Sequence, residues 1–151
     1  MRSLSWREDV VAAAIAGLIA GLVSTLLVVP RAQAQVPRAA ELHKRELIRN
    51  ARAVWGMDAP VATFAAQIHQ ESGWREDARS QYAAGLAQFT PHTADWISGR
   101  YAAELGANQP FNPDWALRAL VRYDKHLWDR VQPETMPACD RMAMTLAAYN
   151  G

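Results

Sequence analysis

The feature that most constrains the fold of this chain is a stretch of twenty residues without a charged side chain, from Val10 to Val29. A helix of that length and composition can cross a lipid bilayer. Because the stretch lies near the N-terminus, residues 35–151 remain to build a globular core, and their number suits a single domain.

The residues directly after the apolar stretch predict processing at the membrane. Ala32-Gln33-Ala34 has the small-x-small form that signal peptidase reads. We predict that residues 1–34 are a signal peptide or a membrane anchor, which would hold the chain in the membrane through residues 10–29 if it is not cleaved. Either outcome predicts that residues 35–151 are exported, to the periplasm or to the periplasmic face of the inner membrane.

The charge and the cysteine content of the predicted exported part argue against several kinds of partner and site. Residues 35–151 carry equal numbers of basic and acidic side chains, so we expect no nucleic-acid partner. The lone Cys139 can form neither an intramolecular disulfide nor a multi-cysteine metal site, and we expect it to be a small buried side chain. The histidines show no ligand spacing, so we predict no metal and no cofactor: His43, His69, His92 and His126.

Apolar residues recur with helical spacing through most of the exported part, and no segment alternates as a strand would. We predict five helices with Gly or Pro near their boundaries, at about residues 40–55, 59–72, 90–98, 112–131 and 140–149. Asp58 is expected to cap the second helix. The last helix is apolar on nearly every side, so we predict that it is central and buried. The fold class is mainly α.

Glu71 is the candidate catalytic group. At about 100° per residue it falls on the edge of the apolar stripe formed by Phe64 and Ile68, near the C-terminal end of the second predicted helix. Partial burial and the negative end of the helix dipole both disfavour the ionised form, so the pKa of Glu71 should be raised. The alternative is an ordinary exposed glutamate at a helix end.

Three short motifs follow one another along the chain: Glu71-Ser72-Gly73-Trp74, Gly85-Leu86-Ala87-Gln88 and Ala148-Tyr149-Asn150. Their types and order resemble those of the soluble lytic transglycosylase family (SLT domain), within the lysozyme-like superfamily. The resemblance covers about residues 59–151. It implies a lysozyme-like helical domain preceded by one N-terminal hydrophobic signal or anchor helix, and it implies that peptidoglycan glycan strands are the partner.

The resemblance also implies roles for individual residues. Glu71 would be the single acid and base, and Ser80, Gln88, Tyr149 and Asn150 would contact the substrate, with the tyrosine hydroxyl holding the glutamate. The expected reaction cleaves the β-1,4 bond between N-acetylmuramic acid and N-acetylglucosamine and leaves 1,6-anhydromuramic ends, because the C6 hydroxyl of the substrate can replace water as the nucleophile.

Two other functions stay open from the sequence. A hydrolytic muramidase of the goose-type lysozyme kind would need a second carboxylate or a positioned water, and Glu76 and Asp77 lie in a polar loop where a solvated role is expected. A membrane-tethered glycan-binding or scaffold module would be catalytically weak. Tyr82 stands where relatives often have Gly, and relatives continue with helical sequence beyond Gly151, so we expect a catalytic domain over residues 35–151 that is truncated at its C-terminal end.

Overall fold

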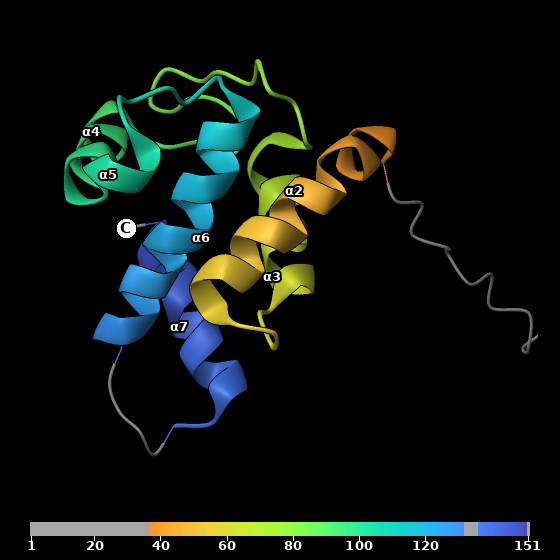
Figure 1. Cartoon of the computed structure of the whole chain (residues 1–151), viewed down its shortest axis with the longest axis vertical. Coiled ribbons are helices and arrows are strands. Elements are labelled where there is room, and N and C mark those ends of the chain that lie inside the picture. Colours follow the sequence, from red (N-terminus) through yellow and green to blue (C-terminus); the bar gives the residue numbers. More distant parts are fainter. Residues whose placement is uncertain (1–36, 132–135, 151) are drawn as a thin grey trace, which may run out of the picture. The chain divides into compact units, whose positions relative to one another are not determined.

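The computed structural model describes residues 37–131 and 136–150, which belong to one compact unit, Val36–Gly151. The predicted signal peptide or anchor lies outside the described residues. Within them no helix is both long and apolar enough to cross a membrane. The described residues form six helices, shown in Figure 1: α2 (Arg38–Trp55), α3 (Val61–Ser72), α4 (Pro91–Arg100), α5 (Ala102–Leu105), α6 (Pro113–Arg130) and α7 (Ala138–Tyr149).

The prediction of a mainly α fold is confirmed for this part of the chain, where only isolated β-bridges accompany the helices. Side-chain caps start two of the predicted helices: Thr90 accepts a hydrogen bond from the backbone N–H of Thr93 (3.1 Å), and Asn112 accepts from that of Trp115 (3.2 Å). The expected cap at Asp58 is wrong. α3 begins at Val61, so Pro60 occupies the cap position, and the proline side chain has no atom that can accept a hydrogen bond.

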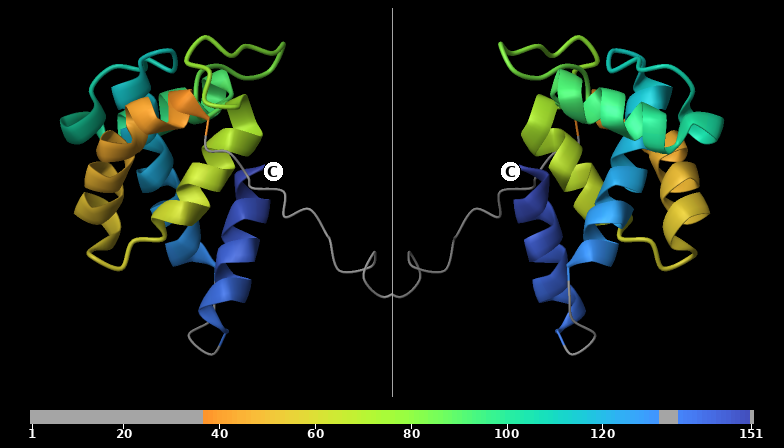
Figure 2. Two further views of the ribbon diagram at one scale, coloured as in Figure 1. Left: turned by 90° about the vertical axis from the view of Figure 1, so that its right-hand side faces the viewer. Right: turned by 90° about the vertical axis from the view of Figure 1, so that its left-hand side faces the viewer.

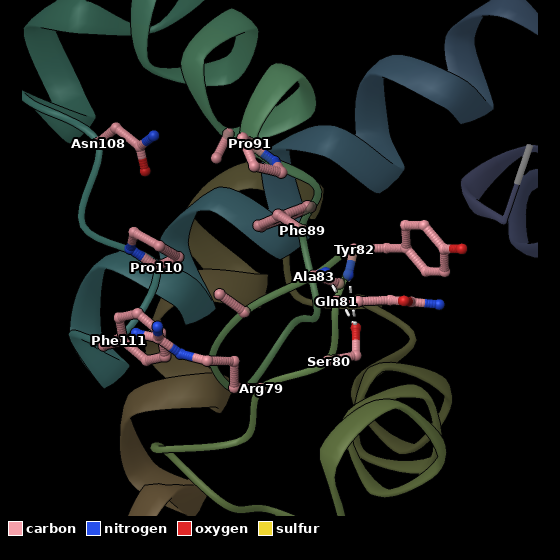
Figure 3. Close-up of a pocket in the computed structure, with 12 residues that line it drawn as sticks. Arg79, Ser80, Gln81, Tyr82, Ala83, Phe89, Pro91, Asn108, Pro110 and Phe111 are labelled. Atoms are coloured by element: carbon pink, nitrogen blue, oxygen red, sulfur yellow. Dashed lines mark hydrogen bonds between the residues drawn. The ribbon is translucent and has the colours of Figure 1, made fainter.

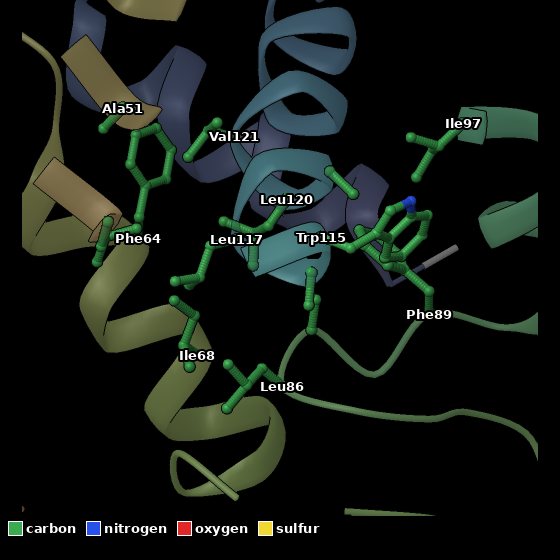
Figure 4. Close-up of a cluster of buried hydrophobic side chains, with 14 of the residues drawn as sticks. Ala51, Phe64, Ile68, Leu86, Phe89, Ile97, Trp115, Leu117, Leu120 and Val121 are labelled. Atoms are coloured by element: carbon green, nitrogen blue, oxygen red, sulfur yellow. The ribbon is translucent and has the colours of Figure 1, made fainter. Parts of the chain in front are cut away.

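Helix α6 is the centre of the fold (Figures 1 and 2), and α2, α4, α5 and α7 all pack against it. Its inner face meets side chains of α3 and of the loop before α4 (Figure 4). These residues form one buried cluster with α2, including Ala51, Phe64, Ile68, Leu86, Phe89, Ile97, Trp115, Leu117, Leu120 and Val121. The buried cluster therefore extends along α3 as far as Ile68, one turn before Glu71.

Helix α7 contradicts the prediction of a central, buried helix. Thr145 is its one buried residue, and Met144 is 50% exposed. The residues that are at least partly buried lie on a single stripe at helical spacing: Arg141, Met142, Thr145, Leu146 and Tyr149. Composition misled the prediction because small apolar side chains such as alanine do not require neighbours on every side.

The expectation for Cys139 is also wrong, since its side chain is exposed in the first turn of α7. The stripe that α7 turns toward α6 begins two residues later, at Arg141, whose guanidinium donates to the carbonyl oxygen of Trp128 and lies over its ring. Cys139 lies in the turn before this contact and stays exposed.

Candidate active site

Glu71 lies in the last turn of α3, as predicted, and is half-buried. Phe64 and Ile68 are fully buried on the same helix and form its apolar support. Burial raises the pKa of the Glu71 carboxyl above its ordinary value, which agrees with the predicted direction and with the first of its two predicted causes. A carboxyl in this state holds its proton to higher pH than a solvated one, as a general acid requires.

A tight turn ends α3 immediately after Glu71. Gly73 adopts a left-handed conformation (φ 61°) and Trp74 follows with φ 68°, which is uncommon for a residue with a side chain. The Trp74 side chain is only 4% exposed, so its packing in the core compensates for the backbone strain. This burial also makes Trp74 a core residue rather than a sugar-stacking surface.

The loop of the second motif packs closely beneath α6. Gly85 has φ 74°, and a Cβ there would lie 1.7 Å from the carbonyl oxygen of Pro110, so no larger residue fits. Gln88 donates through Nε2 to the carbonyl oxygens of Gly85 (2.8 Å) and Ala78 (3.2 Å). In the described residues both hydrogen bonds of this side chain use Nε2, so Oε1 keeps its capacity as an acceptor.

Tyr149 ties the end of α7 to this loop. Its hydroxyl donates a hydrogen bond of 2.6 Å to the carbonyl oxygen of Ala87, and its ring packs against Phe89 and Tyr123, with centroid distances of 5.7 and 5.4 Å. Burial raises the pKa of the hydroxyl well above its ordinary value, and the nearby charge of Glu71 adds to the shift. Tyr149 therefore lies close enough to Glu71 for the charge of the carboxylate to affect the pKa of the tyrosine hydroxyl.

Ser80 lines a separate pocket, whose lining residues Figure 3 draws as sticks. Its Oγ accepts hydrogen bonds from the backbone N–H groups of Tyr82 (3.2 Å) and Ala83 (2.9 Å), so its own proton is free to be donated. The cavity has a volume of about 290 Å³, and Glu71 is not among the residues that line it: Arg79, Ser80, Gln81, Tyr82, Ala83, Ala84, Phe89, Pro91, Ala94, Asn108, Pro110 and Phe111.

Asn150 ends α7, where its side-chain amide donates to the carbonyl oxygen of Leu146 (3.1 Å). The side chain is exposed and caps the helix rather than reaching Glu71 in this conformation. Of the residues that the sequence singles out, Tyr149 and Gln88 thus lie around the loop beside Glu71, whereas Ser80 and Asn150 lie at its margins.

Sequence reasoning missed two buried polar residues behind Glu71. Asp124 on α6 is 0% exposed, and its Oδ1 accepts a hydrogen bond of 3.3 Å from Nε2 of Gln67 on α3. A signal was present, because Asp124 stands seven residues after Leu117 and four after Leu120, in the stripe that α6 buries. A charged residue at such a core position marks a site that needs an explanation.

The fold and the site define a small, mainly helical domain, consistent with the lysozyme-like type, that presents one half-buried glutamate beside a glycine-containing loop and a tyrosine of its last helix. The family model of the transglycosylase SLT domain matches residues 46–151, and the chain belongs to this family. No curated protein matches the chain. Family membership supports a transglycosylase-type function that acts on peptidoglycan.

Proposed function

We propose that this chain is a peptidoglycan lytic transglycosylase in which Glu71 alone serves as acid and base. The observation that carries this proposal is the half-buried position of Glu71, whose pKa burial raises, at the end of a helix that the core holds in place. Family membership supplies the substrate class, glycan strands of peptidoglycan.

The reaction needs two proton transfers, and one carboxyl can perform both. Protonated Glu71 donates its proton to the oxygen between N-acetylmuramic acid and N-acetylglucosamine, and the bond from that oxygen to C1 breaks. The C6 hydroxyl oxygen of the same muramic acid bonds to C1, and its proton passes to the Glu71 carboxylate. Glu71 is then protonated again, no water is consumed, and the products are a 1,6-anhydromuramic end and a free 4-hydroxyl.

The other residues of the site have supporting roles in this proposal. Tyr149 orders the loop beside Glu71 through its bond to Ala87 and lies close enough for its ionisation to respond to the charge of Glu71. Ser80 and Gln88 keep one donor and one acceptor, respectively, for the polar substituents of the sugars. Asn150 would contact the glycan only after releasing the carbonyl oxygen of Leu146.

The geometry gives less support to a water-using muramidase. A hydrolase would need a carboxylate that can activate a water on the opposite face of the sugar. Asp124 is a carboxyl group close enough to Glu71 for their charges to interact. Its side chain is 0% exposed, so it cannot reach such a water. Glu76 lies 3.1 Å from Nε2 of His43, which engages that carboxylate with α2.

Substitution of Glu71 tests the proposal. Glu71→Gln keeps the size and shape of the side chain but cannot give up a proton, so we expect turnover of purified sacculi to fall by about 10²–10⁴-fold or more. The melting temperature should be no lower than that of the natural chain, because the amide replaces a carboxyl whose pKa burial raises. Asp77→Asn is the matched control, because Asp77 is exposed in the following loop, and it should keep full turnover. An equal loss in Asp77→Asn or Glu76→Gln would contradict a single acid and point to a two-carboxylate hydrolase.

We also propose that residues 1–34 direct the chain out of the cytoplasm, on the basis of the uncharged stretch from Val10 to Val29. Fractionation of cells that produce the full chain, followed by N-terminal sequencing, tests this proposal. A new N-terminus at Gln35 would identify a cleaved signal peptide, and an intact chain in the membrane fraction would identify an anchor. An intact chain in the cytoplasm would contradict export.

A further inference from the structure

Asp124 is a buried carboxyl group without a countercharge. It is 0% exposed on the inner face of α6, and no ion pair within the described residues includes it. The one side-chain hydrogen bond that it makes with the described residues comes from Nε2 of Gln67, at 3.3 Å from Oδ1. Burying an ionised carboxylate with one neutral hydrogen bond is unfavourable, so the charge state of Asp124 needs an explanation.

Two unsatisfied atoms point to that explanation. Oδ2 of Asp124 and Oε1 of Gln67 are both buried without a hydrogen-bond partner. While Asp124 is ionised, both atoms are acceptors, and neither can satisfy the other. A proton on Oδ2 changes this, because Oδ2–H can donate to Oε1 of Gln67 while Nε2–H of Gln67 donates to Oδ1. The acid and the amide then form a neutral pair with two hydrogen bonds.

The pair lies directly behind the proposed catalytic group. Gln67 and Glu71 are four residues apart on α3, so they share one face of the helix, one turn from each other. We propose that Asp124 is a protonated positioning residue, whose neutral pair with Gln67 fixes the Glu71-bearing turn of α3 against α6. The positioning role rests on the proposed function of Glu71, whereas the existence of the neutral pair does not.

The charges around Asp124 agree with a bound proton. Burial, together with a smaller contribution from the charge of Glu71 on α3, raises the pKa of Asp124 to about 7, although the hydrogen bond from Gln67 lowers it. Among the described residues, the charge of Asp124 contributes to the raised pKa of Tyr123 on α6 and of Tyr149 on α7, and neither tyrosine can become a cation. The buried residues of α2, which packs closely on α6, carry no charge: Ala40, Leu47, Asn50 and Ala51.

The dependence of stability on pH tests the bound proton without any measurement of activity. The folded pKa of Asp124 lies above its unfolded value, so the folded protein loses stability as pH rises from the unfolded value toward the folded one. Asp124→Asn cannot ionise, and its amide can pair with Gln67 in the same way. We expect the variant and the natural chain to melt at similar temperatures near pH 4, and the variant to melt about 5 °C or more higher at pH 7.5.

Asp77→Asn provides the control, since it removes an exposed carboxyl and should melt like the natural chain at both pH values. A variant Asp124→Asn that melts lower than the natural chain at pH 7.5 would overturn the proposal, because it would show a stabilising carboxylate at this position. A difference that does not change with pH would overturn it as well.

The positioning role is tested by comparing Asp124→Asn with Asp124→Leu. The asparagine variant should keep turnover within about threefold near pH 5, and the leucine variant, which leaves both polar ends of Gln67 without a partner, should lose tenfold or more in kcat with little change in KM. A leucine variant with natural turnover would overturn positioning. If it does not fold, Gln67→Met provides the same test, because that substitution removes the pair from the side of α3.

Titration of the Glu71 carboxyl by NMR tests whether the two carboxyl groups interact. A variant that only loosened the packing of the core would not change the number of titration steps. The two carboxyl groups titrate as a pair, so the Glu71 signal of the natural chain should show a second step near the pKa of Asp124, and Asp124→Asn should remove that step. A single step in both proteins would contradict the coupling. If Glu71→Gln keeps its turnover, the proposed function fails, while the neutral pair is still decided by the melting temperatures.

Discussion

Helix α7 has the more apolar composition of the two helices α6 and α7, but it is the less buried. Leu117, Leu120 and Val121 of α6 are completely buried, whereas α7 buries only Thr145 and leaves Met144 half exposed. The difference lies in the number of neighbours, because α6 is surrounded by several elements and α7 packs mainly on α6. An apolar composition therefore shows that a helix can be buried, and its contacts decide how much of it is buried.

The largest effect on stability should come from shortening a buried side chain of α6 to alanine. The same change at an exposed side chain of α7 should have almost no effect. Leu120→Ala removes a fully buried side chain, and we expect the free energy of unfolding to fall by about 2–5 kcal/mol. Met144→Ala removes a side chain that is 50% exposed, and its effect should stay within about 0.5 kcal/mol. Urea denaturation of the two variants measures both. Equal losses would show that the exposed face of α7 is covered in solution.

Tyr149 is the point at which α7 matters to the site, so its hydroxyl should have a measurable effect. Tyr149→Phe removes the hydrogen bond to Ala87, which should cost about 0.5–1.5 kcal/mol of stability. Turnover should fall by more than that loss explains, because the bond orders the loop beside Glu71. Tyr101→Phe, whose hydroxyl makes no hydrogen bond in the described part of the chain, is the control. Natural turnover in Tyr149→Phe would show that the hydrogen bond from α7 to the loop is not needed for catalysis.

The smallest effect is a displacement of the pH profile. Burial at the edge of the core raises the pKa of Glu71 above 4.5, so the protonated acid persists to higher pH than it would in an unfolded chain. Activity that requires this proton should therefore fall as pH rises through the raised pKa. The midpoint of kcat/KM against pH measures it. A midpoint at or below 4.5 would place Glu71 in solvent, as exposed as the outer face of α7.

Much of the domain could be predicted from local signals. Thr90-Pro91 and Asn112-Pro113 start helices because their side chains cap the first turn and proline suits it, and Gly56 and Gly73 end helices because they adopt positive φ. The place of Glu71 at the edge of an apolar stripe followed from helical periodicity. These features depend on residues close in sequence, so they need no knowledge of the tertiary structure.

Apart from the cap expected at Asp58, the features that escaped prediction depend on contacts between different segments of the chain. The exposure of Cys139 and of α7 follows from which face of that helix meets α6, and the pairing of Gln67 with Asp124 joins residues 57 positions apart. The use of Nε2 of Gln88 within its own loop likewise follows from the way the loop folds back on Ala78. Motif spacing predicted the candidate residues, and packing determined which of their polar atoms are already used in hydrogen bonds.

The products of sacculus digestion test most directly whether Glu71 works without a second carboxylate. Purified sacculi are digested with the natural chain, and the released muropeptides are analysed by mass spectrometry before any reduction. We expect 1,6-anhydromuramic ends, each lighter by one water than a hydrolysed end. Digestion with Glu71→Gln should release none of these products. Reducing muramic ends as the main product would contradict this expectation, because they would show that water attacks C1 and that another group activates it.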